Sequence, residues 1–164
     1  MSRRLKQVAA GLVVAFAAAQ LVPSERANPP TDPSRTIEAH VGKASGLVAV
    51  LNRACGDCHS NGTAWPWYTQ IAPLSWLMAK GVTLGRKAVN FSEWAAYSPE
   101  QRQTLLVAAC NDVSGGTMPG RSWTLLHPEA RLSPQDVETI CAAARQTAAA
   151  SAATDSAPQF RRDP

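Results

Sequence analysis

The positions of apolar residues along the chain predict a set of amphipathic helices. Apolar side chains recur at the spacing of a helix face in residues 36–54, 73–89, 98–114 and 133–145. A serine-proline pair opens each of the last two segments, and serine caps a helix while proline suits its first turn. The sequence offers no alternating run long enough for a strand. We therefore expect an all-α domain in which the last helix packs against the first.

The N-terminus has the order of features found in an export signal. Residues 1–6 are basic, and residues 8–22 are apolar apart from one glycine and one glutamine. As a helix, this apolar run would span about 22 Å, which is short of the roughly 30 Å hydrocarbon core of a membrane. We expect residues 1–22 to be a signal peptide, or a retained inner-membrane anchor, rather than a buried core helix. Either would place the rest of the chain in the periplasm, an oxidising compartment.

Composition divides the remainder into three parts. Four prolines mark residues 23–35 as an extended linker, and residues 36–146 form the predicted domain. Residues 147–164 are rich in alanine, serine and polar residues, and we expect a disordered tail there. Three of the 16 basic residues lie in the first six positions, and the rest of the chain is nearly neutral. Such a balance argues against nucleic-acid binding, which needs a clustered basic face.

The sequence Cys-Gly-Asp-Cys-His at residues 55–59 carries the clearest chemistry. Cys-x-x-Cys-His is the attachment signature of c-type haem. One helical turn places the two thiols, Cys55 and Cys58, beside the two vinyl groups of one porphyrin edge. The following residue, His59, then meets the iron through a neutral imidazole nitrogen.

Three other interpretations compete for these cysteines. They could form a local disulfide, or a redox dithiol of the thioredoxin type, although that motif prefers a βαβ setting. A zinc site would need four ligands, and the other two cysteines lie far along the chain on predicted helices. We therefore favour one haem c, attached covalently through Cys55 and Cys58.

A six-coordinate iron needs a ligand on its distal side, and Met118 is the first candidate. It lies in the glycine-rich sequence 115–120, where backbone can approach a flat cofactor closely. A methionine ligand opposite histidine raises the reduction potential and suits electron transfer. His127 is the alternative, as an iron ligand or a propionate partner. Arg86 and Lys87 could also neutralise propionates, or simply lie on a solvated helix face.

Other residues have structural interpretations. Cys110 and Cys141 lie on apolar helix faces, and we expect a disulfide worth about 3–4 kcal/mol, with two buried free thiols as the alternative. We expect Leu74, Leu77 and Met78 to face inward from the helix over 73–89, and His40 to have a structural role. Aromatic residues near the motif could wall the cofactor or belong to an ordinary core: Trp65, Trp67, Tyr68, Trp76, Phe91 and Trp94.

The order of these motifs resembles the bacterial haem-binding domain family of small exported c-type cytochromes. The likeness covers roughly residues 20–140 and rests on Arg26 and on segments 20–23, 28–30, 55–63, 66–68, 71–73, 75–77, 85–86, 90–94, 118–119 and 127–128. It implies one covalent haem held by Cys55, Cys58 and His59, with Met118 as distal ligand. The chain departs from the family at Gly56 and Trp65, where members often have tyrosine, and at residues 142–144, where members often have tryptophan. These departures concern packing rather than attachment.

Together these features predict a cytochrome-c-like helical domain wrapped around one haem. We expect one-electron transfer with a redox partner protein, and no enzymatic activity. The alternative is a haem-based sensor or ligand-binding module, whose sixth iron position would be open or weakly held. A haem subunit docked to a dehydrogenase is a third possibility.

Overall fold

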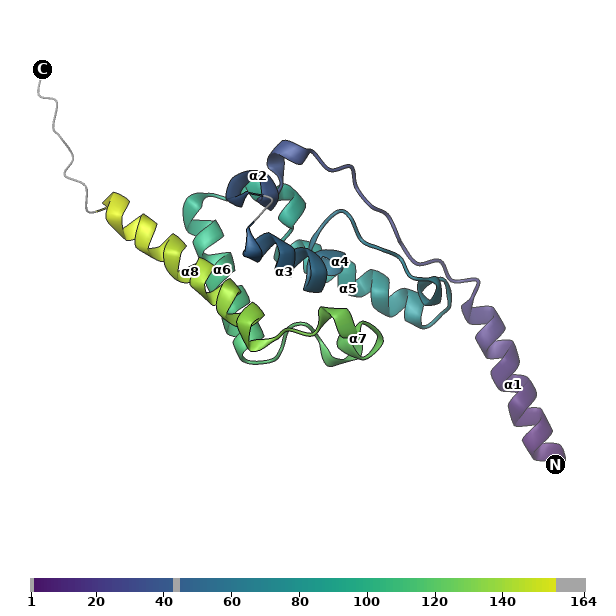
Figure 1. The fold of residues 1–164 in the computed structure, drawn as a ribbon. Helices are drawn as coiled ribbons and strands as arrows, with labels where there is room; N and C mark the ends of the chain where they lie inside the picture. Colours follow the sequence, from purple (N-terminus) through teal and green to yellow (C-terminus); the bar gives the residue numbers. More distant parts are fainter. Residues whose placement is uncertain (1, 43–44, 156–164) are drawn as a thin grey trace, which may run out of the picture.

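The computed structural model describes residues 2–42 and 45–155, and within them every regular element is a helix. The predicted all-α class is therefore confirmed (Figure 1). The α-helices are α1 (Arg3–Ala19), α2 (Ile37–Val41), α3 (Gly46–Ala54), α4 (Gly56–His59), α5 (Leu74–Ala88), α6 (Pro99–Ser114), α7 (Arg121–Leu126) and α8 (Pro134–Asp155). Four short 3-10 helices join them: η1 (Pro33–Arg35), η2 (Trp67–Gln70), η3 (Phe91–Ala96) and η4 (Pro128–Ala130).

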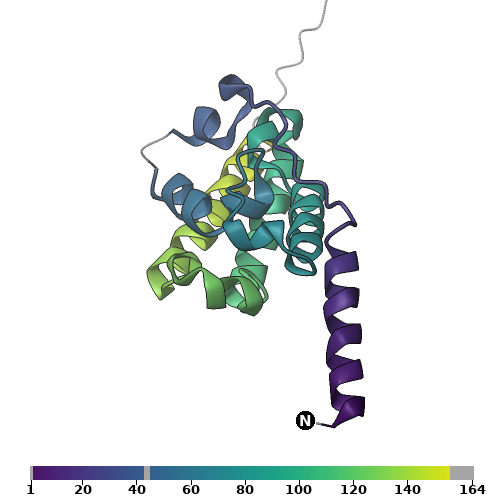
Figure 2. The ribbon, with the colours of Figure 1, turned by 90° about the vertical axis from the view of Figure 1, so that its right-hand side faces the viewer.

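Helix α1 projects from the body of the molecule (Figure 2), and none of its residues is buried. The alternative of a buried core helix is therefore wrong. The end of α1 is fixed to the body because Gln20 accepts a hydrogen bond from the Ala72 amide at 2.9 Å and the Trp76 indole donates to the Val22 carbonyl at 3.1 Å. In the described part of the chain, none of the helices is long and apolar enough to cross a membrane.

The proline-rich segment after α1 is extended and lies against the domain. Arg86 on α5 fixes it: the guanidinium donates to the Ala27 carbonyl at 2.8 Å and to Asn28 Oδ1 at 2.9 Å. The same guanidinium donates to the Ser60 carbonyl at 2.7 Å and to Thr63 Oγ1 at 2.8 Å. Arg86 thus joins the N-terminal segment to the loop that follows α4.

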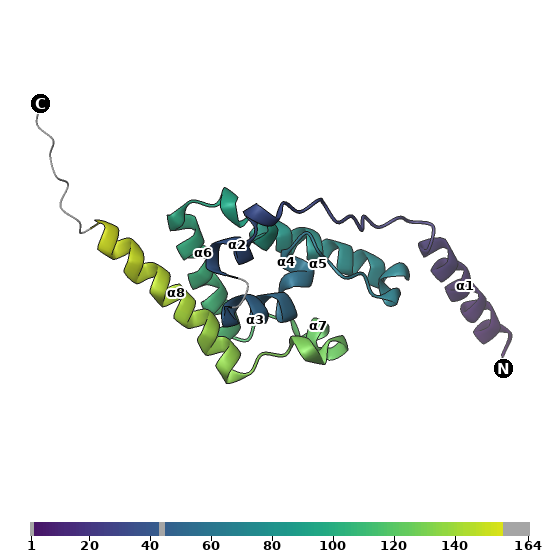
Figure 3. The same cartoon turned by 45° about the horizontal axis from the view of Figure 1, so that its top comes forward.

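The core lies where α3, α6, α8 and η3 meet. Its largest fully buried apolar side chains are Ile37, Leu51, Trp94 and Ile140. Helices α6 and α8 lie side by side (Figures 1 and 3), and α8 also packs on α3, as predicted for the first and last helices of the domain. The expected disulfide between Cys110 and Cys141 is present and joins α6 to α8.

Two helices begin as predicted. Ser98 caps α6 by accepting from the Gln101 amide at 3.3 Å, and the Gln101 side chain accepts from the Ser98 amide at 2.8 Å. Ser133 makes the equivalent reciprocal pair with Asp136 at the start of α8. Capping of this kind satisfies amide groups that have no partner within the helix.

Three expectations about the helices need correction. The helix expected over 36–54 is divided, because Gly42 takes φ +83°, a left-handed conformation that ends α2. Leu77 on α5 points outward, with 65% of its surface exposed, and Leu74 is also exposed. The buried face of α5 is one position farther on, at Ser75, Met78, Ala79, Val82 and Gly85.

The last helix is also longer than expected. Helix α8 continues to Asp155, so part of the segment expected as a disordered tail is helical. Alanine has the highest intrinsic helix propensity, which explains how an alanine-rich sequence extends a helix already formed. The rest of that expected tail, 156–164, lies outside the described residues.

We expect the Cys110–Cys141 disulfide to contribute about 3–4 kcal/mol to the free energy of unfolding, because it closes a loop with a separation of 31 residues. Urea unfolding of the double variant Cys110→Ala/Cys141→Ala measures the loss. Each single variant should lose about as much as the double, since both break the same bond. Equal stability of the double variant and the wild-type protein would contradict a structural disulfide.

Candidate functional site

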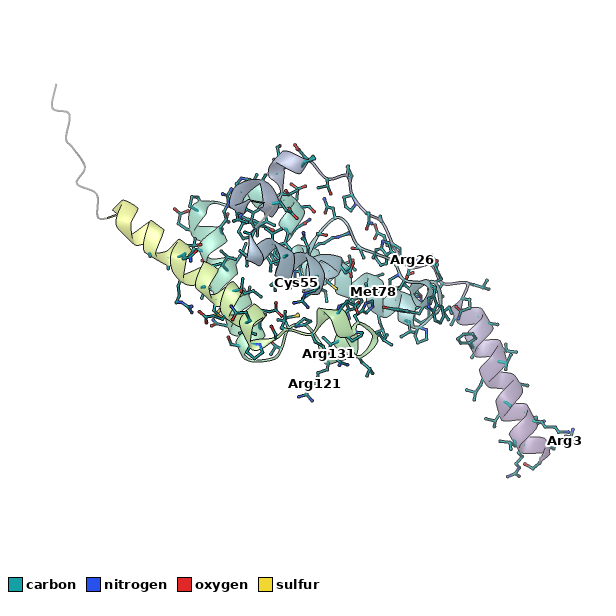
Figure 4. The ribbon with its side chains drawn as sticks, viewed as in Figure 1. Arg3, Arg26, Cys55, Met78, Arg121 and Arg131 are labelled. Atoms are coloured by element: carbon teal, nitrogen blue, oxygen red, sulfur yellow. A yellow bond between two sulfur atoms is a disulfide. The ribbon has the colours of Figure 1, made fainter. Side chains whose placement is uncertain are left out.

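The Cys-x-x-Cys-His sequence forms one short helical turn at the end of α3. The amides of Cys58 and His59 both donate to the Cys55 carbonyl, at 3.1 and 3.0 Å. This turn brings the side chains of Cys55 and Cys58 to the same cavity, and both thiols are free. Figure 4 shows Cys55 in the middle of the body, far from Arg3 at the start of α1.

His59 is oriented by the backbone at the end of α5. Its Nδ1 lies 3.2 Å from the Val89 carbonyl oxygen, which can only accept a hydrogen bond. Nδ1 therefore carries the proton, and Nε2 keeps its lone pair for a metal. Burial lowers the pKa of the imidazole, while hydrogen bonds to the Val89 and Gly85 carbonyls act in the opposite direction. The neutral form that burial favours is the form that binds iron.

The backbone of α5 approaches α4 very closely at Gly85. A Cβ atom at this position would lie 2.4 Å from the Cys58 carbonyl oxygen and 2.9 Å from its carbonyl carbon. Only glycine allows this approach without moving one of the two helices. Since Gly85 lies one turn before Val89, the contact also brings the Val89 carbonyl within reach of His59.

The environment of the two thiols does not suit a reactive dithiol. Burial raises the pKa of Cys55 to about 11, and burial and the Asp57 carboxylate raise the pKa of Cys58. Redox-active cysteines have the opposite property, a lowered pKa that populates the thiolate. Cys110 and Cys141, which a zinc site could have used, are bonded to each other.

Two cavities flank the motif, and both are lined by Cys55, His59 and Met118. The larger, of about 170 Å³, lies among α3, α5, α6 and α8 and is lined almost wholly by apolar side chains. Phe91 forms part of its wall, with its ring centroid 5.9 Å from that of His59. The smaller, of about 70 Å³, also includes Trp123 on α7.

These residues provide what a c-type haem requires: two free thiols, an imidazole with a free nitrogen, a thioether and apolar walls. Both cavities are smaller than the roughly 300–1,000 Å³ of typical ligand sites. A haem bound here would therefore need the lining side chains to take other positions. Met118 lines both cavities and is 48% exposed, and Pro119 and Gly120 line the smaller one.

His127, the alternative distal ligand, has other partners. Its Nδ1 lies 2.8 Å from the Glu129 carboxylate, and its Nε2 accepts a hydrogen bond from the Tyr68 hydroxyl. Its ring stacks on Trp123, with centroids 3.6 Å apart and an interplanar angle of 13°. Both nitrogens of His127 are therefore engaged away from the cavities that Met118 and His59 line.

Other candidate residues are placed differently from the expectations. Of the aromatic residues expected near a cofactor, Phe91 lines the larger cavity, whereas Trp94 is buried in the core and Trp67 is exposed. Trp123, which lines the smaller cavity, is not among the predicted site residues. Its only signal in the sequence is its place between Met118 and His127. The guanidinium of Arg86 already donates hydrogen bonds to the N-terminal segment and to the loop after α4, so a role in binding haem propionates is not supported. Met78 is buried as expected, and His40 Nδ1 lies 2.9 Å from the Thr36 carbonyl.

We expect Gly85→Ala to lower the free energy of unfolding by about 1–3 kcal/mol, the usual effect of overpacking, because the new methyl group collides with backbone of α4. Gly81→Ala is the matched control, since a Cβ atom one turn earlier on the same helix meets nothing within 4 Å. That control should gain about 0.5–1 kcal/mol from helix propensity. Urea unfolding distinguishes the two, and equal effects would contradict the close approach.

Comparison with known proteins supports the cofactor independently of this geometry. Residues 14–146 match the family described as the Haem-binding domain. No curated protein and no solved structure matches the chain. Because the family match covers most of the 164 residues, including the motif and Met118, the chain belongs to the Haem-binding domain family and binds haem.

Proposed function

We propose that this protein is a c-type cytochrome that carries single electrons to a partner protein. In this proposal Cys55 and Cys58 attach one haem through thioether bonds. His59 is the proximal iron ligand and Met118 the distal one. The observation that carries the proposal is the setting of His59, whose Nδ1 is bound to the Val89 carbonyl at the end of a turn that also presents two free thiols.

The chain's own residues would orient the ligands and exclude water. The Val89 carbonyl fixes the ring of His59 and makes its free nitrogen a better donor. On the opposite side, the Met118 amide donates to the Asp112 carbonyl at 3.3 Å, which ties the methionine to the end of α6. Apolar walls would keep the cofactor dry. When bound, haem supplies a one-electron iron couple, whose potential a methionine ligand raises.

We propose a carrier rather than an enzyme because the polar side chains at the larger cavity already have structural partners. His59 bonds the Val89 carbonyl through Nδ1 and, in this proposal, binds iron through Nε2. The Asp112 carboxylate accepts from the Thr117 hydroxyl at 2.9 Å. Neither is left to act as a general base toward a substrate.

We further propose that the domain works in the periplasm. The basic and apolar order of residues 1–22 supports export, with α1 as a cleaved leader or a retained anchor. The Cys110–Cys141 disulfide agrees with this compartment, because structural disulfides persist where the surroundings are oxidising.

The direct test is a visible spectrum of the protein, oxidised and reduced, from a host that attaches c-type haem, followed by a pyridine haemochrome assay. We expect a c-type haemochrome and, in the oxidised protein, a sulfur-to-iron absorption band. A c-type spectrum without that band, together with ready binding of carbon monoxide when reduced, would favour the sensor. Absence of haem would contradict the attachment.

Replacing Met118 tests the distal ligand. We expect Met118→Ala to abolish the sulfur-to-iron band and to lower the reduction potential by on the order of 0.1 V or more, within the roughly 0.8 V over which axial ligands act. Met78→Leu is the matched control, because Met78 is buried on α5 and lines neither cavity next to His59. Redox titration measures the reduction potentials of both variants, and that of Met78→Leu should stay close to the wild-type value. A sulfur-to-iron band retained in Met118→Ala would exclude Met118 as the distal ligand.

A further inference from the structure

The segment that carries Met118 is fixed at its N-terminal side by α6. The amides of Thr117 and Met118 donate to the Asp112 carbonyl at 3.0 and 3.3 Å, and the Thr117 hydroxyl donates to the Asp112 carboxylate. These bonds set where the segment leaves α6. They do not set the direction in which it continues, since Gly120 follows two residues later and α7 begins at Arg121.

On the C-terminal side, α7 is only lightly held. It has six residues and none of them is buried. In the described part of the chain, its hydrogen bonds stay within residues 120–131, such as the one from Arg131 Nε to the Thr124 carbonyl at 3.3 Å. The residues after it are better fixed, because Arg53 on α3 donates to the carbonyls of Glu129 and Arg131.

His127, the residue directly after α7, connects the two regions. The Glu129 carboxylate can only accept, so the hydrogen bond of 2.8 Å puts the His127 proton on Nδ1 and leaves Nε2 to accept from Tyr68. Burial raises the pKa of the Tyr68 hydroxyl, which therefore remains a donor. The His127 side chain is 14% exposed, so water competes poorly for these bonds.

Tyr68 belongs to a different part of the fold. It lies in η2, which packs on α5, and it is separated from His127 by 59 residues in sequence. Within the described residues, the Tyr68–His127 bond joins the end of α7 to η2 and, through η2, to α5. Trp123 transmits the constraint back along α7, because it stacks on His127 and lines the same small cavity as His59 and Met118.

We propose that Tyr68 and His127 are positioning residues that hold α7 against the body of the protein and thereby keep Met118 facing His59. The inference rests on the proposed function, in which Met118 is the distal ligand. Met118 is half exposed and its neighbours on α7 are not buried, so little else presses its side chain toward the cavity. Loss of the bond loosens α7 and makes the sixth position easier for another ligand to take.

The test is a titration of the oxidised, haem-loaded protein with imidazole, which competes for the sixth position. We expect Tyr68→Phe to raise the apparent affinity for imidazole about threefold to tenfold, the equivalent of one hydrogen bond. The sulfur-to-iron band should disappear at correspondingly lower imidazole. Thr104→Val is the matched control: its hydroxyl donates to the Glu100 carbonyl at 2.9 Å on the exposed face of α6, it lines neither cavity next to His59, and the imidazole affinity of this variant should not change.

His127→Phe provides the second variant, because it keeps a ring that can stack on Trp123 and removes both hydrogen bonds. If one bond acts as proposed, Tyr68→Phe should add nothing in the His127→Phe background. Amide hydrogen exchange in residues 120–127 should rise in both variants while exchange in α5 stays unchanged.

The outcomes separate this inference from the proposed function. Absence of the sulfur-to-iron band from the wild-type protein would contradict Met118 as the distal ligand. It would therefore overturn both that part of the proposed function and the positioning role of Tyr68 and His127. A wild-type band, with imidazole affinity unchanged in both variants, overturns the positioning role alone. The positioning role would also be overturned if His127→Phe abolished the band while Tyr68→Phe kept the full band and the imidazole affinity of the wild-type protein.

Discussion

The close approach of two helix backbones at Gly85 and Cys58 is the constraint on which the site depends. With a Cβ position 2.4 Å from the Cys58 carbonyl oxygen, α5 can lie against α4 only because residue 85 has no side chain. One turn later, the same helix end presents the Val89 carbonyl to His59. The spacing of glycine and carbonyl along α5 therefore determines both where the Cys-x-x-Cys-His turn lies and which nitrogen of its histidine is free.

The two sides of the site differ in how they are built. The His59 side rests on α3, α4 and α5, whose contact faces are buried. The Met118 side rests on a glycine-rich segment and on α7, which buries none of its residues. Proteins open most easily where few apolar contacts hold the chain. The side that carries His59 is therefore the more firmly packed of the two.

Much of this could be predicted from sequence because the signals are local. The Ser98 and Ser133 caps, the Cys-x-x-Cys-His turn and the helix patterns each depend on residues a few positions apart. The disulfide needed only two apolar helix faces that could meet. What could not be predicted depends on distant partners: the division at Gly42, the outward Leu77, the bonds of Arg86, and the engagement of His127 by Tyr68. The residue type determines what chemistry a titratable side chain can perform. Its hydrogen-bond partners elsewhere in the fold determine whether the side chain is free to perform it.

The disulfide between α6 and α8 has a consequence for thiol selectivity. The chain has four cysteines, all within the described residues, and pairing Cys110 with Cys141 leaves Cys55 and Cys58 as the two free thiols. An oxidising compartment could otherwise join any two of the four, and three complete pairings would compete. A chain that forms the distant pair first presents two adjacent thiols in one helical turn and no others. Formation of the Cys110–Cys141 disulfide thereby determines which two thiols of the chain remain able to react.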